Sequence, residues 1–157
     1  MKAHMTSLEV KVPPPAVAAV VALTMWGISL AAPLLKMPTA LRLVAATVIL
    51  VLGVFFSASG VLSFRRAGTT LNPTKPGAAS SLVSSGMYRF TRNPMYVGLT
   101  LVLVAWAVFL SSGWALLGPV AFILYIGRFQ IAPEERVLSS LFGSEYVAYK
   151  SKVRRWL

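Results

Sequence analysis

The sequence has 157 residues, a length that fits one domain. Hydrophobic residues make up 57% of it and charged residues only 12%, whereas a soluble domain usually carries about 25% charged residues. Little of the surface therefore needs to face water. This composition disfavours a soluble globular protein and favours a protein that lies in a lipid bilayer.

The formal net charge is +11, from 15 basic and 4 acidic residues. The basic residues gather at the ends of apolar runs, a pattern typical of contact with an anionic membrane surface. No basic patch alternates with exposed aromatics, so we expect no nucleic-acid partner. The sequence has no cysteine and its single histidine is His4, which excludes thiolate chemistry and leads us to expect no metal site.

The first apolar run extends from Val12 to Leu35. Proline is tolerated only in the first turn of a helix, so the helix should begin near Pro15. About 20 residues then remain, enough to cross a bilayer. We interpret residues 1–14 as an N-terminal tail, in which the stretch up to Met5 looks like a vector-derived remnant.

The second apolar run, from Leu43 to Phe64, is flanked by arginines and predicts another membrane span. Residues 15–64 thus hold two spans. Residues 65–94 form a loop rich in proline, glycine and threonine, with no helical or strand periodicity. Long loops in compact proteins are usually functional, so we expect this one to contribute to a site.

A third apolar stretch reaches from Asn93 to Gly127. As one straight helix it would measure about 50 Å, too long for a hydrocarbon core of about 30 Å. The turn-forming residues Ser111–Gly113 predict a break. Residues 95–128 therefore form a helical hairpin, with arms Met95–Leu110 and Trp114–Arg128, which either spans twice or enters and leaves on one side.

After Ala132 and Pro133, apolar residues recur every three or four positions, as in an amphipathic helix that Gly143 interrupts. Residues 133–157 are therefore expected to form a C-terminal helix and a basic tail at the membrane interface. The predicted fold is an all-α integral membrane protein, a single domain over residues 1–157. It has about four transmembrane helices, two spans plus the hairpin, and a C-terminal amphipathic cytoplasmic helix.

The distribution of basic residues predicts the topology. The loop after the second run and the C-terminal segment are both rich in lysine and arginine, and the hairpin turn has neither. By the positive-inside rule, both termini and the polar segments are expected in the cytoplasm; for a bacterial protein the membrane would be the inner or plasma membrane. Lys36 and Arg42, on the opposite side, are a modest signal against this orientation.

Two polar segments flank the hairpin, and the hairpin should bring them together. The first has the pattern Gly86-x-Tyr88-x-x-x-Arg92-Asn93-Pro94-x-Tyr96-x-Gly98. The second has Glu134-Glu135-x-x-Leu138-x-x-x-Phe142-Gly143-x-x-Tyr146-x-x-Tyr149, followed by Val153-x-Arg155-Trp156. Together they resemble the isoprenylcysteine carboxyl methyltransferase and phospholipid methyltransferase family, as a minimal bacterial-type member. Thr70-x-Asn72-Pro73 is similar to a loop of bacterial members.

What the resemblance implies is methyl transfer from S-adenosylmethionine (SAM), with S-adenosylhomocysteine (SAH) as product, to a lipophilic acceptor that resides in the membrane. Such a displacement needs alignment and exclusion of water more than a strong base. The inventory of residues is compatible with that requirement. The eukaryotic enzymes usually have histidine where this chain has Asn93, so specificity for prenylcysteine does not carry over safely.

The resemblance also implies roles for individual residues. Arg92, Glu135 and Arg128 are the candidates for catalysis, with Arg92 on the cofactor's carboxylate and Arg128 on an anionic group of the substrate. The candidates for cofactor binding are Tyr88, Arg92, Asn93, Pro94, Tyr96, Gly98, Glu134 and Glu135.

Simpler roles exist for several of these residues. Gly98 is as well explained by helix packing as by clearance for a cofactor. We expect Tyr146 and Tyr149 to be aromatic residues of the membrane interface, and Arg154 and Arg155 to contact lipid headgroups.

Two other functions remain open, a membrane reductase dependent on NADPH and a non-enzymatic accessory protein. The acceptor is left open between a carboxylate, a phospholipid amine and a small lipophilic thiol or amine. The oligomeric state is open as well.

Overall fold

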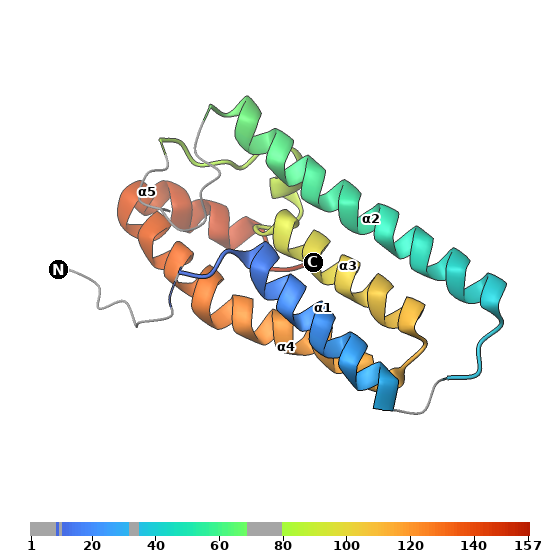
Figure 1. Cartoon of the computed structure of the whole chain (residues 1–157). Coiled ribbons are helices and arrows are strands. Elements are labelled where there is room, and N and C mark those ends of the chain that lie inside the picture. The colour runs from blue at the N-terminus through green and yellow to red at the C-terminus, as the bar shows by residue number, and fades with distance from the viewer. Residues whose placement is uncertain (1–8, 10, 32–34, 69–79) are drawn as a thin grey trace.

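The computed structural model describes residues 9, 11–31, 35–68 and 80–157, and these are almost entirely helical. Figure 1 shows the helices in chain order. In order, the elements are α1 (Pro14–Ala31), α2 (Thr39–Arg66), the 3₁₀ turn η2 (Gly86–Arg89), α3 (Pro94–Leu110), the 3₁₀ turn η3 (Gly113–Leu116), α4 (Leu117–Ile126), the π-helix η4 (Gly127–Ile131) and α5 (Ala132–Lys152).

The predicted fold class is confirmed. Three helical stretches are long and apolar enough to cross a membrane: Pro14–Ala31, Thr39–Arg66 and the stretch that begins at Gly113. The fourth, α3, is apolar but has only 17 residues, a length of about 26 Å at 1.5 Å per residue. It lies along α2 in the bundle (Figure 1). The chain is therefore an integral membrane protein.

The tip of the predicted hairpin lies at the same end of the bundle as the connection between α1 and α2. Ser111 ends α3 in a left-handed conformation, with φ of 53°. Its carbonyl oxygen accepts a hydrogen bond from the Leu35 amide at 2.7 Å, and its hydroxyl donates to the Leu35 carbonyl at 2.9 Å. Both connections thus meet at one level, so the hairpin reaches as far along the bundle axis as α1 and α2 do.

Small residues let α2 and α3 approach closely. The buried residues of α2 include Ala46, Gly53 and Gly60, each seven positions from the next, a spacing that keeps one face of a helix toward a partner. A methyl group built on Gly53 would lie 2.9 Å from the Gly98 carbonyl oxygen. One on Gly98 would collide with the Ser57 hydroxyl and the Gly53 carbonyl.

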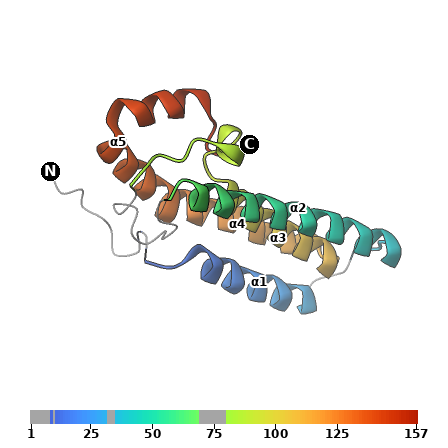
Figure 2. The same ribbon diagram turned by 90° about the horizontal axis from the view of Figure 1, so that it is seen from above.

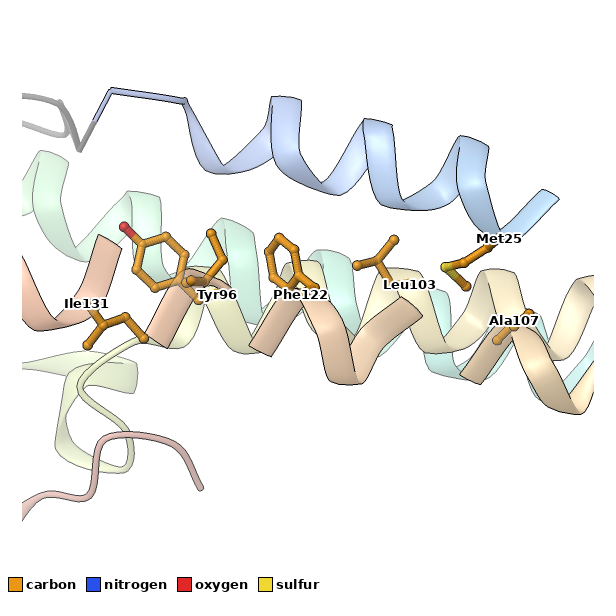
Figure 3. Close-up of a cluster of buried hydrophobic side chains, with 8 residues drawn as sticks. Met25, Tyr96, Leu103, Ala107, Phe122 and Ile131 are labelled. Carbon is orange, nitrogen blue, oxygen red and sulfur yellow. The ribbon is translucent and has the colours of Figure 1, made fainter. Parts of the chain in front are cut away.

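The hydrophobic core lies between α1, α3 and α4. Figure 3 shows side chains in a row along the bundle, from Met25 of α1 at one end to Ile131 at the other. Phe122 and Ile126 of α4 have no exposed surface, so they fix the rotation of α4 against its neighbours. Tyr96 is the one polar side chain of this row, and it lies at the end where α3 begins.

The structure differs from expectation at the end of the hairpin. We expected separate helices on either side of Ala132 and Pro133, but α4, η4 and α5 follow one another without a non-helical residue. The π-helix accommodates Pro133, whose ring would crowd the carbonyl four residues earlier in a regular α-helix. The predicted interruption lies at Gly143, whose φ is 48° and ψ −122°.

Beyond Gly143 the second half of α5 turns back over one end of the bundle, as Figure 2 shows. The C-terminus lies beside the segment that precedes α3 (Figures 1 and 2). We call this the polar end of the bundle. The Thr70-x-Asn72-Pro73 motif and the tail up to Met5 lie outside the described residues.

Candidate functional site

The C-terminal tail is fastened to the residues just before α3. The Arg92 amide donates to the Arg154 carbonyl at 2.9 Å, within a parallel bridge between Thr91 and Arg154. The Asn93 side-chain amide donates to the Arg155 carbonyl at 2.8 Å, and the Thr91 hydroxyl donates to the same oxygen at 3.3 Å. Thr91 is fully buried. These bonds bring the two sequence motifs into direct contact.

A buried ion cluster has formed around Glu135. Its carboxylate forms an ion pair with Arg92 at 3.0 Å and accepts hydrogen bonds from Arg155 Nε and Nη2 at 3.0 and 2.6 Å. Only 11% of the Glu135 side chain and 10% of the Arg92 side chain is exposed. The hydrogen bond with Glu135 raises the pKa of Arg155. Two cations against one anion leave this cluster with a net charge of +1.

Arg92 has bonding capacity left in this cluster. One of its terminal nitrogens serves Glu135 and the Tyr146 hydroxyl, the latter at 3.5 Å. Its Nε is buried and has no hydrogen-bond partner in the part of the chain that the structure describes. Because a buried N–H without a partner is costly, it is a candidate donor to a bound ligand.

Glu134, the neighbouring residue, lies in a different environment. Its Oε1 accepts from the Tyr96 hydroxyl at 2.7 Å and from the Gln130 side-chain amide at 2.7 Å. Both of these donors are neutral, and both residues are buried. No ion pair of Glu134 is found among the described residues. Glu134 thus places a carboxyl group, held by two neutral donors, at the end of the helical core.

Tyr88 packs beside this cluster from η2. Its ring contacts Phe64 edge-on at 5.4 Å, and its carbonyl accepts a hydrogen bond from the Tyr149 hydroxyl at 2.7 Å. Burial, together with smaller contributions from Tyr149 and Glu134, raises the pKa of the Tyr88 phenol. The ring therefore remains neutral and contributes an aromatic wall to the polar end.

Most of the predicted site residues come together at this end. Arg92, Glu134, Glu135 and Tyr96 make the contacts described above, and Asn93 and Pro94 begin α3 beside them. Gly98 packs against α2, which favours helix packing over clearance for a cofactor. Arg128 instead bonds to Glu9 at 2.9 Å and stacks over Phe129, so its predicted role in binding substrate stays a prediction.

Two expectations for the C-terminal segment are wrong. Tyr146 is only 2% exposed and accepts a hydrogen bond from Arg92, so it belongs to the site and not to an aromatic belt. Arg155 is committed to Glu135 rather than to lipid headgroups. The sequence predicted an amphipathic helix with an interruption at Gly143, but not that the helix folds back at this point.

Three residues that make buried hydrogen bonds or ion pairs near this end of the bundle were not indicated by the sequence pattern. Thr91 is an unspecified position of the first motif and Gln130 lies four residues before the second; both are uncharged, and only the structure shows that they are buried. Glu9 lies far from both motifs along the chain. Its contacts across 119 and 127 residues cannot be deduced from periodicity.

A comparison with known protein families identifies the family of this chain. The family model described as phospholipid methyltransferase matches residues 41–145, which include nearly all of α2, all of α3 and α4, and α5 as far as Glu145. The chain belongs to the phospholipid methyltransferase family. The expected resemblance is thereby confirmed, and with it the assignment of the chain to a class of membrane methyltransferases.

Individual relatives agree with this membership. An uncharacterized protein of Haemophilus influenzae is 56% identical over 63 residues, 40% of this chain and 100% of that protein. Protein-S-isoprenylcysteine O-methyltransferase B of Arabidopsis thaliana is 28% identical over 107 residues, 66% of this chain and 53% of the plant protein. Methanethiol S-methyltransferase 1 of Bradyrhizobium diazoefficiens is 39% identical over 69 residues, 43% of this chain and 22% of that enzyme.

The match thus spans about half of the plant enzyme and about a fifth of the Bradyrhizobium enzyme. These two relatives are named for methyl transfer to oxygen and to sulfur, respectively. The family membership establishes a methyltransferase scaffold, and the two names differ in the atom that receives the methyl group.

Proposed function

We propose that this protein transfers a methyl group from SAM to a lipophilic acceptor that resides in the membrane and presents a carboxylate or an amine. Family membership supports methyl transfer. The choice of SAM as donor rests on the different partners of two adjacent residues. Glu135 is shared by two arginines, whereas Glu134 has only neutral partners among the described residues. Bound here, SAM would supply a methyl group activated by the sulfonium; the acceptor would attack this methyl carbon in line, and SAH would leave.

The residues present fit the amino-acid portion of SAM. The cluster of Arg92, Glu135 and Arg155 has a net charge of +1 and a buried, unpartnered Nε–H on Arg92, which suits a carboxylate. Among the described residues, Glu134 is held only by the neutral Tyr96 and Gln130, so its carboxylate suits an ammonium or a sulfonium. Adjacent positive and negative groups match the two charges of a zwitterion.

We assign Arg92 to the donor's carboxylate and Glu134 to its cationic groups. Glu135 is assigned to holding the two arginines, because its carboxylate is already occupied by both. Tyr88 and Tyr96 provide aromatic faces near the sulfonium, to which a cation is attracted. The remaining requirement, exclusion of water, is served by burial of Thr91, Tyr96 and Tyr146.

An apolar cleft supports the lipophilic nature of the acceptor. It has a volume of about 550 Å³ and lies where α1 and α2 both pack on α3. Its lining is almost entirely carbon, from Pro15 near the polar end to Phe109 near the other. Val102 in this lining is six residues from Tyr96, about 9 Å along α3. A hydrocarbon chain lying here would keep its reactive head near Tyr96.

The positive-inside rule supports a cytoplasmic location for the polar end and both termini. SAM would then enter the site from the cytoplasm, and the acceptor would enter it from the bilayer. The alternative of a membrane reductase is not favoured by the family membership.

The experiment that tests the proposal is a transfer assay with SAM labelled in its methyl group. Purified protein is incubated with the labelled donor and a bacterial lipid extract, and the organic phase is counted and resolved. Base-labile label in the product indicates an ester and base-stable label an amine. No label above that of a Glu134→Gln variant would contradict the proposal.

A further inference from the structure

Outside the proposed site, one carboxylate is held by two arginines at the junction of α4 and α5. Glu9, five residues before α1, accepts from Arg128 at 2.9 Å through Oε1 and from Arg136 at 2.7 Å through Oε2. The Glu9 side chain is 2% exposed, whereas the two arginine side chains are 55% and 46% exposed. Glu9 lies 119 and 127 residues from its two partners in the sequence, so this buried carboxylate connects distant parts of the chain.

The π-helix makes this double contact possible. Residues of a regular α-helix turn by about 100° each, so positions eight apart point about 80° away from each other. A π-helix, with hydrogen bonds from i to i+5, turns by only about 80° per residue. Arg128 lies within η4 and Arg136 in α5. Three π-helical steps and five α-helical steps separate them, which brings the two guanidinium groups to within roughly 20° of one face.

The same π-helix sets the direction of Glu134. The rotation of α4 is fixed by Phe122 and Ile126, which are completely buried. Relaxation of η4 to a regular α-helix would turn α5 by about 100° against α4. The Glu134 carboxylate would then leave the Tyr96 hydroxyl, to which it now lies at 2.7 Å.

We propose that Glu9 is a positioning residue. By joining Arg128 to Arg136 across η4, it holds the π-helix and so keeps Glu134 turned toward Tyr96. This rests on the proposed function, because it gives Glu134 the task of binding the donor's cationic groups. Glu9 thereby maintains the geometry of the methyl-donor site through the two arginines that it binds.

The test compares Glu9→Gln, which keeps the shape and removes the charge, with Glu145→Gln. Glu145 is an exposed carboxylate on the same helix α5 and changes the net charge equally. Each protein is purified in detergent and titrated with SAH, and amide hydrogen exchange is followed by mass spectrometry. We expect Glu9→Gln to weaken SAH binding about tenfold and to speed exchange in residues 127–131 about tenfold. We expect Glu145→Gln to match the wild type.

Two further comparisons separate positioning from general support. Glu9→Asp keeps the charge and should recover most of the SAH affinity. In a Glu134→Gln background, Glu9→Gln should weaken SAH binding no further, because the group through which it acts is gone. If Glu9→Gln does not yield folded protein, Arg136→Lys, which keeps the charge but not the planar fork, takes its place in the same measurements.

The outcomes are distinct. Faster exchange throughout all helices, or equal loss of SAH affinity with and without Glu134, would show that Glu9 merely supports the fold and would overturn the proposal. Unchanged exchange in residues 127–131 would overturn it as well. If the wild type binds no SAH, the proposed function fails on its own. The exchange comparison of Glu9→Gln with Glu145→Gln would still decide whether Glu9 holds η4.

Discussion

Arg155 binds Glu135 through two parallel hydrogen bonds, from Nε to Oε1 at 3.0 Å and from Nη2 to Oε2 at 2.6 Å. This geometry is the planar fork that arginine offers to a carboxylate. Its consequence is mechanical as well as electrostatic. The bond closes the C-terminal tail onto the first turn of α5, and the tail in turn covers the residues that precede α3.

Replacing Arg155 with lysine should damage the site. Lysine keeps the charge but cannot make the two parallel hydrogen bonds, so the tail is held less firmly. Glu135 then competes with the bound donor for Arg92. We expect a loss of about 1 kcal/mol in stability, small because the Arg155 side chain is 42% exposed, and weaker SAH binding. Thermal unfolding and calorimetric titration measure the two effects.

Arg154→Ala is the matched control for this substitution. The Arg154 side chain is exposed, and its contacts to Arg92 and Thr91 use its backbone. Alanine should therefore preserve both stability and SAH affinity. Equal losses in the two variants would show that basic charge, and not the fork, matters at this end of the chain.

The fold was predictable where it depends on hydropathy and on residues that break helices or form turns. The lengths of the apolar runs, the prolines before α1 and the break at Ser111 all follow from local physical chemistry. The continuous path from α4 into α5 did not follow, because a π-helix that absorbs Pro133 has no compositional signature. The contacts of Gln130 and Glu9 depend on tertiary packing, which a single sequence does not reveal.

The two adjacent glutamates should respond differently to neutralisation. Glu134→Gln removes a charge that has only neutral partners, so stability should change little while SAH affinity falls at least about tenfold. Glu135→Gln leaves Arg92 and Arg155 without their anion, and should cost about 2 kcal/mol in stability, since one of the two arginines is largely buried. Identical stability profiles for the two variants would contradict the separate roles.

The packing role of Gly98 makes a separate prediction. Alanine at this position would meet the Ser57 hydroxyl and the Gly53 carbonyl, so Gly98→Ala should destabilise the protein by about 2 kcal/mol through overpacking. Gly27→Ala on α1 is the control, because nothing lies within 4 Å of its added methyl group. A normal melting temperature for Gly98→Ala, with SAH binding lost, would instead assign Gly98 to the cofactor.

Filling the apolar cleft should reduce transfer to long-chain acceptors. Ala19 is exposed on α1 and lines the cleft, so phenylalanine at this position occupies the space without displacing the core. We expect Ala19→Phe to lower methyl transfer to lipid extract several-fold and to leave SAH affinity unchanged. Ala16→Phe, also exposed but outside the lining, serves as control. If both variants transfer methyl groups as the wild type does, the cleft does not bind the acceptor.

The central claim is that Glu134 and the Arg92 cluster bind the two charges of the methyl donor. Calorimetric titration of the detergent-solubilised protein with SAH tests it most directly, because SAH has the same amino-acid portion as SAM. We predict one site per chain with a dissociation constant below about 1 mM, and at least tenfold weaker binding in Glu134→Gln. Absence of binding to the folded wild type, or equal affinity in the variant, would contradict the account.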